Sequence, residues 1–475
     1  SFRRMSFPND NAPKDNHYDM LVIGSGPSGQ KAAVQAAKLR KRVAIVEASS
    51  YVGGVSTNTG TIPSKSFREA VLYLSGFRER SLYGSSYRVK SRITMEDLTF
   101  RISSIIKHEH DVIESQLWRN QIEVLHGRAS FVDPHRVMIE SEGSVMTKSA
   151  DYIVVAVGTT PHHPPGFEID SGKILDSDQI LSLKQLPRNI TVVGGGVIGI
   201  EYASMFAVLG VPVTLVEQRD QLLSFVDREI VEALQYHMRN LRITLRLGEE
   251  VASVSRRPDD QVETILKSGK KIVSDAVLVS AGRQGATETL NLNILGIEPD
   301  KYGRIKVNGN FQSTVPHIYA VGDVVGFPAL ASTGMSQGRR ATLHAFQVED
   351  KSEEIPLPYG IYTIPEISLV GETEHSLTEK QIPYETGIAR YSESARGQLI
   401  GDEIGMLKII FHRDSHQLLG VHVIGELATE IVHVGQAVLH LKGGLEYLTD
   451  VVFNYPTLTE AYKVAALDGL NKIRA

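Results

Sequence analysis

The chain has 475 residues, enough for about three domains at ~150 residues each, so we expect several domains rather than one core. Its 42% hydrophobic and 22% charged residues exclude a disordered chain or a fibrous repeat. With 50 Lys and Arg against 55 Asp and Glu, the net charge of -5 is too small and too mixed for binding nucleic acid or an anionic membrane surface. We therefore expect neither partner.

Missing sequence features narrow the chemistry further. No long apolar run is present and the first sixteen residues have no apolar core, which predicts a cytoplasmic protein. The chain has no cysteine, which excludes disulfides, thiol nucleophiles and thiolate metal ligands. His108 and His110 point to different faces of an expected helix and His433, in an apolar helical stretch, is expected in the core, so we expect no metal site. Redox chemistry would then require a cofactor.

One sequence pattern occurs twice. An apolar run ending in the motif GSGPSG (24–29) is followed by a helical stretch of small residues and a second apolar run ending at Glu47. The same order recurs with GGGVIG (194–199) and Glu217. In each copy the acid lies 23 positions after the first glycine. Two βαβ units of one spacing predict two related dinucleotide-binding domains.

Each residue type in this pattern has a physical reason. The first glycine allows a tight turn, the second lets backbone approach a pyrophosphate, and the third allows close helix packing. The amides at the helix start face the phosphates, and the acid accepts hydrogen bonds from ribose hydroxyls. These positions are Gly24, Gly26, Gly29 and Glu47 in the first copy and Gly194, Gly196, Gly199 and Glu217 in the second. An ordinary tight turn is the alternative for either motif alone.

Further apolar runs predict buried strands. Two of them, 152–161 and 275–284, contain a glycine near their end and are expected at domain borders. A third, 315–326, brings Asp323 to the carboxyl end of a strand before a helix of small residues. A carboxylate there suits a ribityl chain, whereas a turn or N-cap role is the alternative. From Pro356 onward, alternating strands followed by helices predict a separate α+β unit.

With these motifs, residues 17–475 resemble the flavoprotein disulfide reductase superfamily. The resemblance implies an α/β fold with two Rossmann-like (glutathione-reductase-type) nucleotide-binding domains plus an α+β C-terminal dimerisation domain. It also implies a homodimer or higher homo-oligomer. The expected order is an N-terminal extension (1–16), the FAD-binding domain (17–160), the NAD(P)-binding domain (161–284), the FAD-binding domain resumed (285–350) and the dimerisation domain (351–475).

The chain departs from this family at the redox site. The family carries two cysteines in a GGxCxxxGCxPSK pattern, whereas this chain reads GGVSTNTGTIPSK, with Ser56 and Thr61 at the cysteine positions. Near the C-terminus, Tyr455 stands where the family has a histidine. Hydroxyls form neither disulfides nor thiolates, and a phenol with a pKa near 10 is a poor base at neutral pH. The resemblance therefore does not extend to dithiol chemistry.

The residues that the family uses for hydride transfer are retained. Lys65 matches the family lysine beside flavin N5, where an ammonium stabilises negative charge on the reduced flavin, and Glu201 matches its paired acid. The alternatives are a solvated helix lysine and a surface helix glutamate. Val197 replaces a tyrosine that covers the flavin in many relatives, with plain helix packing as the alternative.

The segments GTIPSK, NYPTLTEAY and VAALDGLNK narrow the resemblance to the soluble, or Si-specific, pyridine nucleotide transhydrogenases. It implies reversible ping-pong hydride transfer through FAD, with NAD(H) and NADP(H) as substrates. Glu217 suits the 2′-hydroxyl of NAD, and Arg219 would offset its charge beside the 2′-phosphate of NADP, unless it is a surface arginine. An NAD(P)H oxidase or diaphorase using O2 or quinones, and a catalytically silent nucleotide-binding homologue, remain alternatives.

We thus expect Lys65 and Glu201 to be catalytic. The expected cofactor-binding residues are Gly24, Gly26, Pro27, Ser28, Gly29, Glu47, Gly60, Thr61, Lys65, Gly158, Gly322, Asp323, Gly194, Gly196, Gly199, Glu217, Arg219 and Gly282.

Overall fold

The computed structural model describes residues 16–350 and 355–474. The predicted N-terminal extension therefore lies almost wholly outside the described residues. The described chain divides into two compact units. The first comprises 16–58, 106–160 and 283–350, and the second 59–105, 161–282 and 355–474. The predicted domain boundaries remain a prediction.

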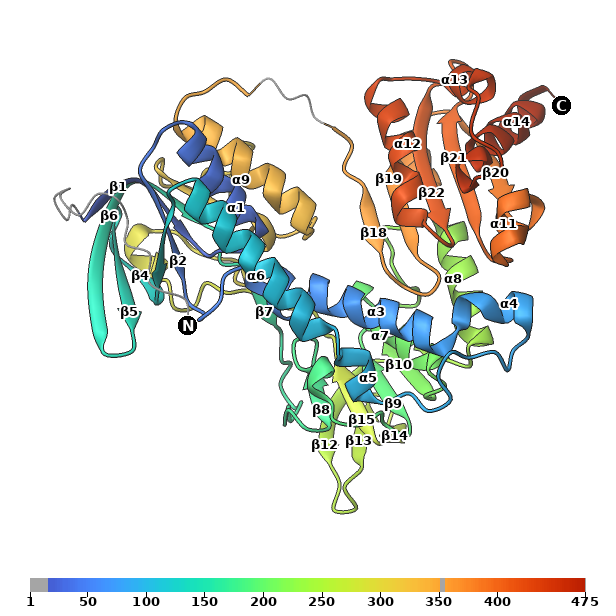
Figure 1. The fold of residues 1–475 in the computed structure, drawn as a ribbon, viewed down its shortest axis with the longest axis horizontal. Coiled ribbons are helices and arrows are strands. Elements are labelled where there is room, and N and C mark those ends of the chain that lie inside the picture. The colour runs from blue at the N-terminus through green and yellow to red at the C-terminus, as the bar shows by residue number, and fades with distance from the viewer. Residues whose placement is uncertain (1–15, 351–354, 475) are drawn as a thin grey trace. The chain divides into compact units, whose positions relative to one another are not determined.

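The first unit is built on one mixed sheet (Figure 1). Strands β3, β2, β1, β6 and β17 are parallel neighbours, and β6 continues into an antiparallel meander with β5 and β4. Their bounds are β1 (His17–Ile23), β2 (Val43–Glu47), β3 (Glu123–His126), β4 (Arg128–Asp133), β5 (Arg136–Ser141), β6 (Ser144–Val155) and β17 (Ile318–Ala320). A two-stranded pair, β7 (Thr159–Pro161) and β16 (Arg283–Gly285), follows it.

Strand β1 is apolar on both faces, and helices cover one of them. Met20 and Val22 pack in a core with residues of α1 (Pro27–Lys38), α6 (Ile102–Arg119) and α9 (Ala331–Ala345). Leu21 and Ile23 point the other way, into a core with Phe131 of β4. Such a two-sided apolar strand is typical of a parallel sheet. Helices α1 and α9 lie side by side (Figure 1), and α2 (Gly54–Asn58) completes the helices of this unit.

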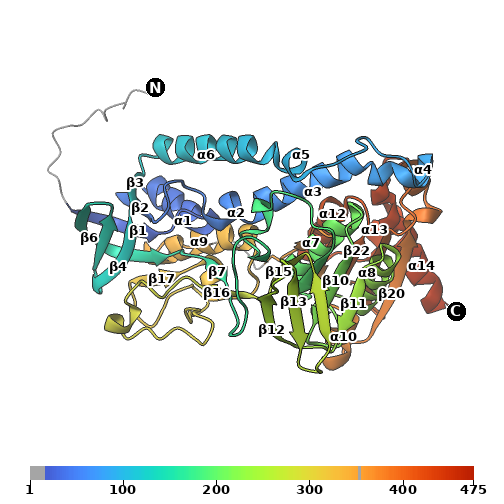
Figure 2. The same ribbon diagram turned by 90° about the horizontal axis from the view of Figure 1, so that it is seen from below.

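The second unit contains a five-stranded parallel sheet of order β11-β10-β9-β15-β8. The strands are β8 (Ile174–Asp176), β9 (Ile190–Val193), β10 (Val213–Glu217), β11 (Thr244–Leu247) and β15 (Ala276–Val279). An antiparallel sheet of β12 (Val251–Arg256), β13 (Val262–Leu266) and β14 (Lys271–Ser274) follows (Figure 2). The helices are α3 (Thr61–Ser75), α4 (Arg80–Tyr83), α5 (Met95–Thr99), α7 (Val197–Val208) and α8 (Arg228–Asn240).

The C-terminal part of the second unit is an antiparallel sheet of order β18-β19-β22-β21-β20, coloured orange to red in Figure 1. Its strands are β18 (Tyr359–Ile361), β19 (Ile367–Gly371), β20 (Tyr384–Arg390), β21 (Met406–His412) and β22 (Leu418–Ile424). Its helices are α10 (Glu374–Glu379), α11 (Ala395–Ile400), α12 (Ala428–His440), α13 (Leu445–Asp450) and α14 (Ala461–Arg474). The predicted fold class is confirmed. Among the described residues, no helix combines the length and apolar character that crossing a bilayer requires.

Candidate functional site

The first glycine turn joins β1 to α1 and leaves the start of the helix open. Gly24 has a φ of +105°, and a Cβ atom there would lie 2.3 Å from the carbonyl oxygen of Ala156, so only glycine fits. Gly26 has an ordinary φ of −64°, yet a Cβ atom there would meet nothing within 4 Å. Pro27 begins the helix, and no side chain caps its first amides. Open space in front of uncapped amides is what a pyrophosphate requires.

The second glycine turn, between β9 and α7, repeats this geometry. Gly194 has a φ of +103°, and a Cβ atom there would lie 2.3 Å from the carbonyl oxygen of Ser280. Gly196 has a φ of −74° and is open in the same way as its counterpart. At the third glycine of each turn, Gly29 and Gly199, a Cβ atom would lie 2.0 Å from the oxygen of the first glycine. The repeated spacing therefore folds into two turns of one shape.

Glu47 closes the first turn from the end of β2. Its carboxylate accepts hydrogen bonds from the backbone N–H of Ser25 at 3.1 Å and of Ser49 at 2.8 Å. The Ser25 hydroxyl donates to the same carboxylate. Glu47 is 7% exposed, so its carboxylate is buried beside the turn. A buried carboxylate oriented by backbone amides is well placed to receive a ribose hydroxyl.

Glu217 holds the equivalent position at the end of β10, but with a different neighbour. The backbone N–H groups of Gly195 and Arg219 donate to it at 2.6 Å and 2.9 Å. In addition, the Arg219 guanidinium donates through Nε at 2.9 Å. Burial alone would raise the pKa of Glu217, but the bonds from Arg219 outweigh it and hold the pKa below its usual value. The charge of the Glu217 carboxylate is therefore balanced by the Arg219 guanidinium, whose side chain is 49% exposed.

Asp323 lies in a 3₁₀ turn, Gly322–Val325, beside the first glycine turn of the same unit. The Gly322 N–H donates to the Gln337 side chain of α9 at 2.7 Å, and a Cβ atom at Gly322 would lie 2.5 Å from the Ser28 hydroxyl. Burial raises the pKa of the Asp323 carboxyl, and the Arg283 guanidinium opposes that rise. Asp323 does not cap α9, whose N-cap residue is Leu330, so the N-cap alternative is wrong.

Lys65 and Glu201 form an ion pair between α3 and α7. The Lys65 ammonium lies 2.7 Å from Glu201 Oε2, and the side chains are 26% and 5% exposed. The surface-glutamate alternative for Glu201 is therefore wrong, and Lys65 is not a freely solvated lysine. Glu201 Oε1 accepts the backbone N–H of Tyr362 at 2.8 Å, and the Lys65 ammonium lies 4.8 Å from the centre of the Tyr362 ring. The sequence did not predict this third member.

The other predicted positions lie at or beside the ends of helices and strands. Gly60 precedes α3 and Thr61 is its first residue, while Ser56 lies in α2. Gly158 and Gly282 have φ values of +66° and +100° with nothing within 4 Å of a Cβ atom. Within the first unit the structure thus brings together the first glycine turn, its acid and the 3₁₀ turn. Within the second it pairs the second glycine turn with its acid and arginine.

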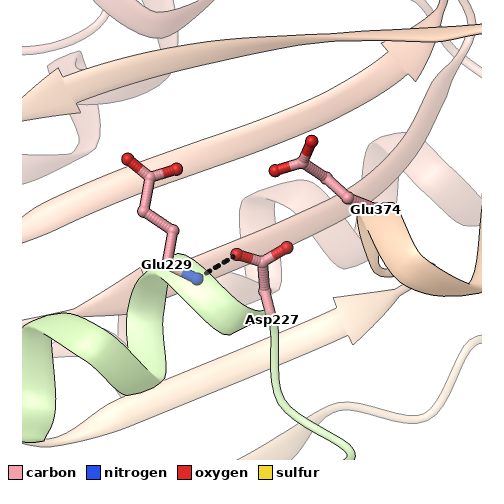
Figure 3. A group of neighbouring side chains, drawn as sticks. All are labelled: Asp227, Glu229 and Glu374. Carbon is pink, nitrogen blue, oxygen red and sulfur yellow. Dashed lines mark hydrogen bonds between the residues drawn. The ribbon is translucent and has the colours of Figure 1, made fainter.

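A group of three carboxylates was also not predicted. Asp227, Glu229 and Glu374 converge on one point (Figure 3), a geometry suited to a cation. The fully buried ammonium of Lys408 takes that place, 2.9 Å from Asp227 and 3.0 Å from Glu229, with Glu374 also bonded. Burial would lower the pKa of Lys408, but the carboxylates raise it above its usual value. The cluster is a structural ion pair that joins α8 to the C-terminal sheet.

Two protein-family models match this chain and identify its family. A family model described as pyridine nucleotide-disulphide oxidoreductase matches residues 18–338, and the model of its dimerisation domain matches residues 357–466. The chain belongs to the pyridine nucleotide-disulphide oxidoreductase family. The predicted family resemblance is confirmed, with a dimerisation domain after the nucleotide-binding part.

Curated relatives match nearly the whole chain. A soluble pyridine nucleotide transhydrogenase of Mycobacterium bovis is 55% identical over 461 residues, covering 96% of this chain and 98% of the relative. Proteins of the same name from Klebsiella pneumoniae and Shigella boydii are 44% and 43% identical. The first covers 96% of this chain and 98% of the relative, and the second 97% and 100%.

Solved structures with different titles share the fold. LpdA from Mycobacterium tuberculosis superposes with a TM-score of 0.87 at 25% identity, covering 94% of this chain and 99% of that one. The HOCl-induced flavoprotein disulfide reductase RclA from Escherichia coli gives a TM-score of 0.84 at 25% identity, covering 95% and 99%. The same fold therefore occurs in a protein named for disulfide reduction and in this chain, which has no cysteine.

Tyr455 and His433, in the C-terminal part of the chain, are both exposed. Tyr455, at the position of the family histidine, is 72% exposed. His433 was expected in the core but is exposed, and its ring lies 2.8 Å from the Gln436 side chain. That prediction was wrong because α12 is amphipathic, and apolar sequence neighbours do not bury a residue that lies on the solvent side of a helix.

Proposed function

We propose that the protein is a flavin-dependent pyridine nucleotide transhydrogenase that catalyses NADPH + NAD⁺ ⇌ NADP⁺ + NADH. The observation that carries this proposal is the pair of matching glycine turns, each with a buried acid, in a chain without cysteine. The name of relatives that are 43% to 55% identical over nearly the full chain supports it. FAD, when bound, accepts a hydride from one dinucleotide and passes it to another.

The residues of the first unit fit FAD. The amides of α1 and the open space at Gly26 suit the pyrophosphate, Glu47 suits the adenosine ribose, and Asp323 suits the ribityl chain. In the second unit, α7 and the open space at Gly196 suit the pyrophosphate of NAD(H) or NADP(H). The other predicted contacts, Pro27, Ser28, Gly60, Thr61, Gly158, Gly282 and Gly322, belong to the same proposal.

Lys65 and Glu201 supply the electrostatics of hydride transfer in this proposal. The Lys65 ammonium would stabilise negative charge that develops on the reduced ring, and Glu201 pairs with the ammonium and orients it. No thiol can take the electrons onward, because the chain has none. The second dinucleotide must then collect the hydride itself, which gives ping-pong kinetics. Both nicotinamide rings are chemically identical, so the ratios of the nucleotides set the direction.

The Glu217–Arg219 pair explains how one site accepts both nucleotides. With NAD(H), Glu217 receives the ribose hydroxyl. With NADP(H), Arg219 can leave the carboxylate, to which it is bonded at 2.9 Å, and meet the 2′-phosphate instead. Because the guanidinium is half exposed, it can turn without unpacking a core. The pair thus compensates for the repulsion that an isolated acid would impose on the phosphate.

We expect Arg219→Ala to discriminate between the two nucleotides. One charge pair at 4 Å is of order 4 kcal/mol at an effective dielectric of 20, and solvent screening reduces this at a half-exposed site. The Michaelis constant for NADPH should therefore rise by roughly tenfold to a hundredfold, and that for NADH by less than about threefold. Steady-state kinetics with each nucleotide measures this. Arg228→Ala, which alters an 88% exposed arginine on α8, is the matched control, and equal effects on both nucleotides would remove the assignment.

The proposed reaction is tested by anaerobic stopped-flow. NADPH should bleach the flavin of the purified protein, and NAD⁺ added in a second mixing step should restore its colour. In steady state, NADPH should reduce a thio- or acetyl-analogue of NAD⁺ without oxygen, with parallel double-reciprocal lines. A requirement for O2 or a quinone would indicate an oxidase or diaphorase instead. A colourless protein, or a yellow one that neither nucleotide bleaches, would indicate a catalytically silent homologue.

The assembly and location belong to the same proposal. Residues 357–466 match a dimerisation domain, which supports a homodimer or a higher homo-oligomer. The relatives are named as soluble enzymes, which supports a cytoplasmic location.

A further inference from the structure

The loop between β18 and β19 holds two helices of the second unit together. The Tyr362 N–H donates to Glu201 Oε1 of α7 at 2.8 Å, and the Ile364 N–H donates to the Ser204 hydroxyl of the same helix at 3.1 Å. The Thr363 carbonyl accepts two bonds from the Arg68 guanidinium of α3, at 3.2 Å and 3.1 Å. Three successive residues of the C-terminal part thus fix the helices that carry Lys65 and its partner.

These contacts are buried, so solvent does not compete for them. Thr363 and Ser204 have no exposed surface, Arg68 is 2% exposed and Glu201 is 4% exposed. A buried carboxylate needs its acceptor positions filled, and Glu201 receives one bond on each oxygen, from Lys65 and from the Tyr362 backbone. The orientation of its carboxylate is therefore set by the loop as much as by the lysine.

The side chain of Tyr362 adds a second constraint, on Lys65 itself. The ammonium lies 4.8 Å from the centre of the ring, within the range of a cation–π contact. Burial raises the pKa of Tyr362, a hydrogen bond with Thr429 opposes that rise, and nearby carboxylates add to it, so the phenol is neutral and the ring acts on Lys65 through its π face. The ammonium therefore has a carboxylate oxygen on one side and an aromatic face on another, which limits its rotamers.

We propose that Tyr362 is a positioning residue for hydride transfer, which orients the Lys65 ammonium through its ring and the Glu201 carboxylate through its backbone N–H. The proposal rests on the role proposed above for Lys65. In this proposal, the C-terminal part of the chain contributes to hydride transfer as well as to assembly. The phenol hydroxyl has no part in it, so the aromatic face alone should suffice.

The test compares two replacements that share the backbone N–H. Tyr362→Phe keeps the ring and should reduce its flavin with NADPH within about twofold of the unmodified rate. Tyr362→Leu loses the ring and should slow that step roughly tenfold at saturating NADPH, a loss in the range of a partly desolvated cation–π contact. The dissociation constant for NADPH and the FAD content should stay within about twofold, because no nucleotide contact is removed.

A double-mutant cycle separates positioning from general damage. In a Lys65→Met background, adding Tyr362→Leu should cause little further loss, because the ring then has no ammonium to orient. Tyr236→Leu, which alters a 69% exposed tyrosine on α8, is the matched control and should have no effect. Additive losses in the cycle, or a Phe variant as slow as the Leu variant, would overturn the proposal. Both outcomes differ from failure of the proposed function, in which the unmodified protein itself transfers no hydride.

Discussion

Gly26→Val should yield a folded protein without bound flavin, whereas Gly196→Val should yield a yellow protein that neither nucleotide can reduce. Both glycines have ordinary φ values and open space at the Cβ position, so the polypeptide itself does not require glycine there. The added side chain would occupy the space in front of the helix amides, where a pyrophosphate must approach backbone. The two substitutions should therefore remove different ligands from one fold.

The measurements are the ratio of flavin to protein absorbance and the flavin reduction rate as a function of nucleotide concentration. We expect Gly26→Val to lose nearly all FAD. For Gly196→Val we expect the dissociation constant for NADPH to rise by at least about a hundredfold, which corresponds to roughly 2.7 kcal/mol. Gly309→Val is the matched control, because Gly309 is also open at the Cβ position and lies outside both turns. Retention of FAD in the first variant, or of ordinary NADPH affinity in the second, would refute the assignment of that turn.

Lys65→Met should slow the reduction of the flavin by about a hundredfold to a thousandfold, the range found when one electrostatic contact to a developing charge is removed. The methionine keeps the length of the side chain but offers no charge to the reduced ring. Among the residues that the structure describes, it also leaves Glu201, 5% exposed, with only the Tyr362 N–H as a hydrogen-bond partner. That uncompensated carboxylate adds its own repulsion, so both effects act in the same direction.

Anaerobic stopped-flow at saturating NADPH measures the effect, and a second variant separates its two sources. Lys65→Met combined with Glu201→Gln removes the unpaired carboxylate and should recover part of the rate, about tenfold or less. Lys472→Met is the matched control, since Lys472 is 40% exposed and pairs with Asp468 on the last helix. Unchanged flavin reduction in Lys65→Met would show that the lysine is structural.

The features that could be predicted from the sequence are those determined by residues that lie close together along the chain. The glycine turns follow from local geometry, because Gly24 and Gly194 need a positive φ and their motifs fix the strand before and the helix after. The acids at the ends of β2 and β10 follow from a fixed spacing along the chain. The Lys65–Glu201 pair was predicted from the family resemblance, because the positions of the two residues along the chain do not indicate a contact.

The residues that were missed depend on contacts between distant parts of the chain. Tyr362 meets Glu201 across 161 positions, and Lys408 meets Asp227 across 181. No periodicity or spacing encodes such pairs. Lys408 lies in the apolar strand β21, where a buried lysine is acceptable only because carboxylates from two other elements converge on it. Tyr362 was not predicted either, since its contacts depend on the faces of two helices, α3 and α7.

The two glycine turns differ in the side chains that contact the acid: the Ser25 hydroxyl donates to Glu47 in the first, and the Arg219 guanidinium donates to Glu217 in the second. In both, the acid accepts the amide that follows the first glycine and the amide two residues beyond itself, and the latter residue is Ser49 in one copy and Arg219 in the other. In the proposed function, Ser49 belongs to the turn that would hold FAD, whereas the long, half-exposed side chain of Arg219 belongs to the turn that would receive two different nucleotides. On this proposal, exchanging Arg219 alone should alter the preference between NAD(H) and NADP(H) and leave the fold intact, because its side chain is half exposed.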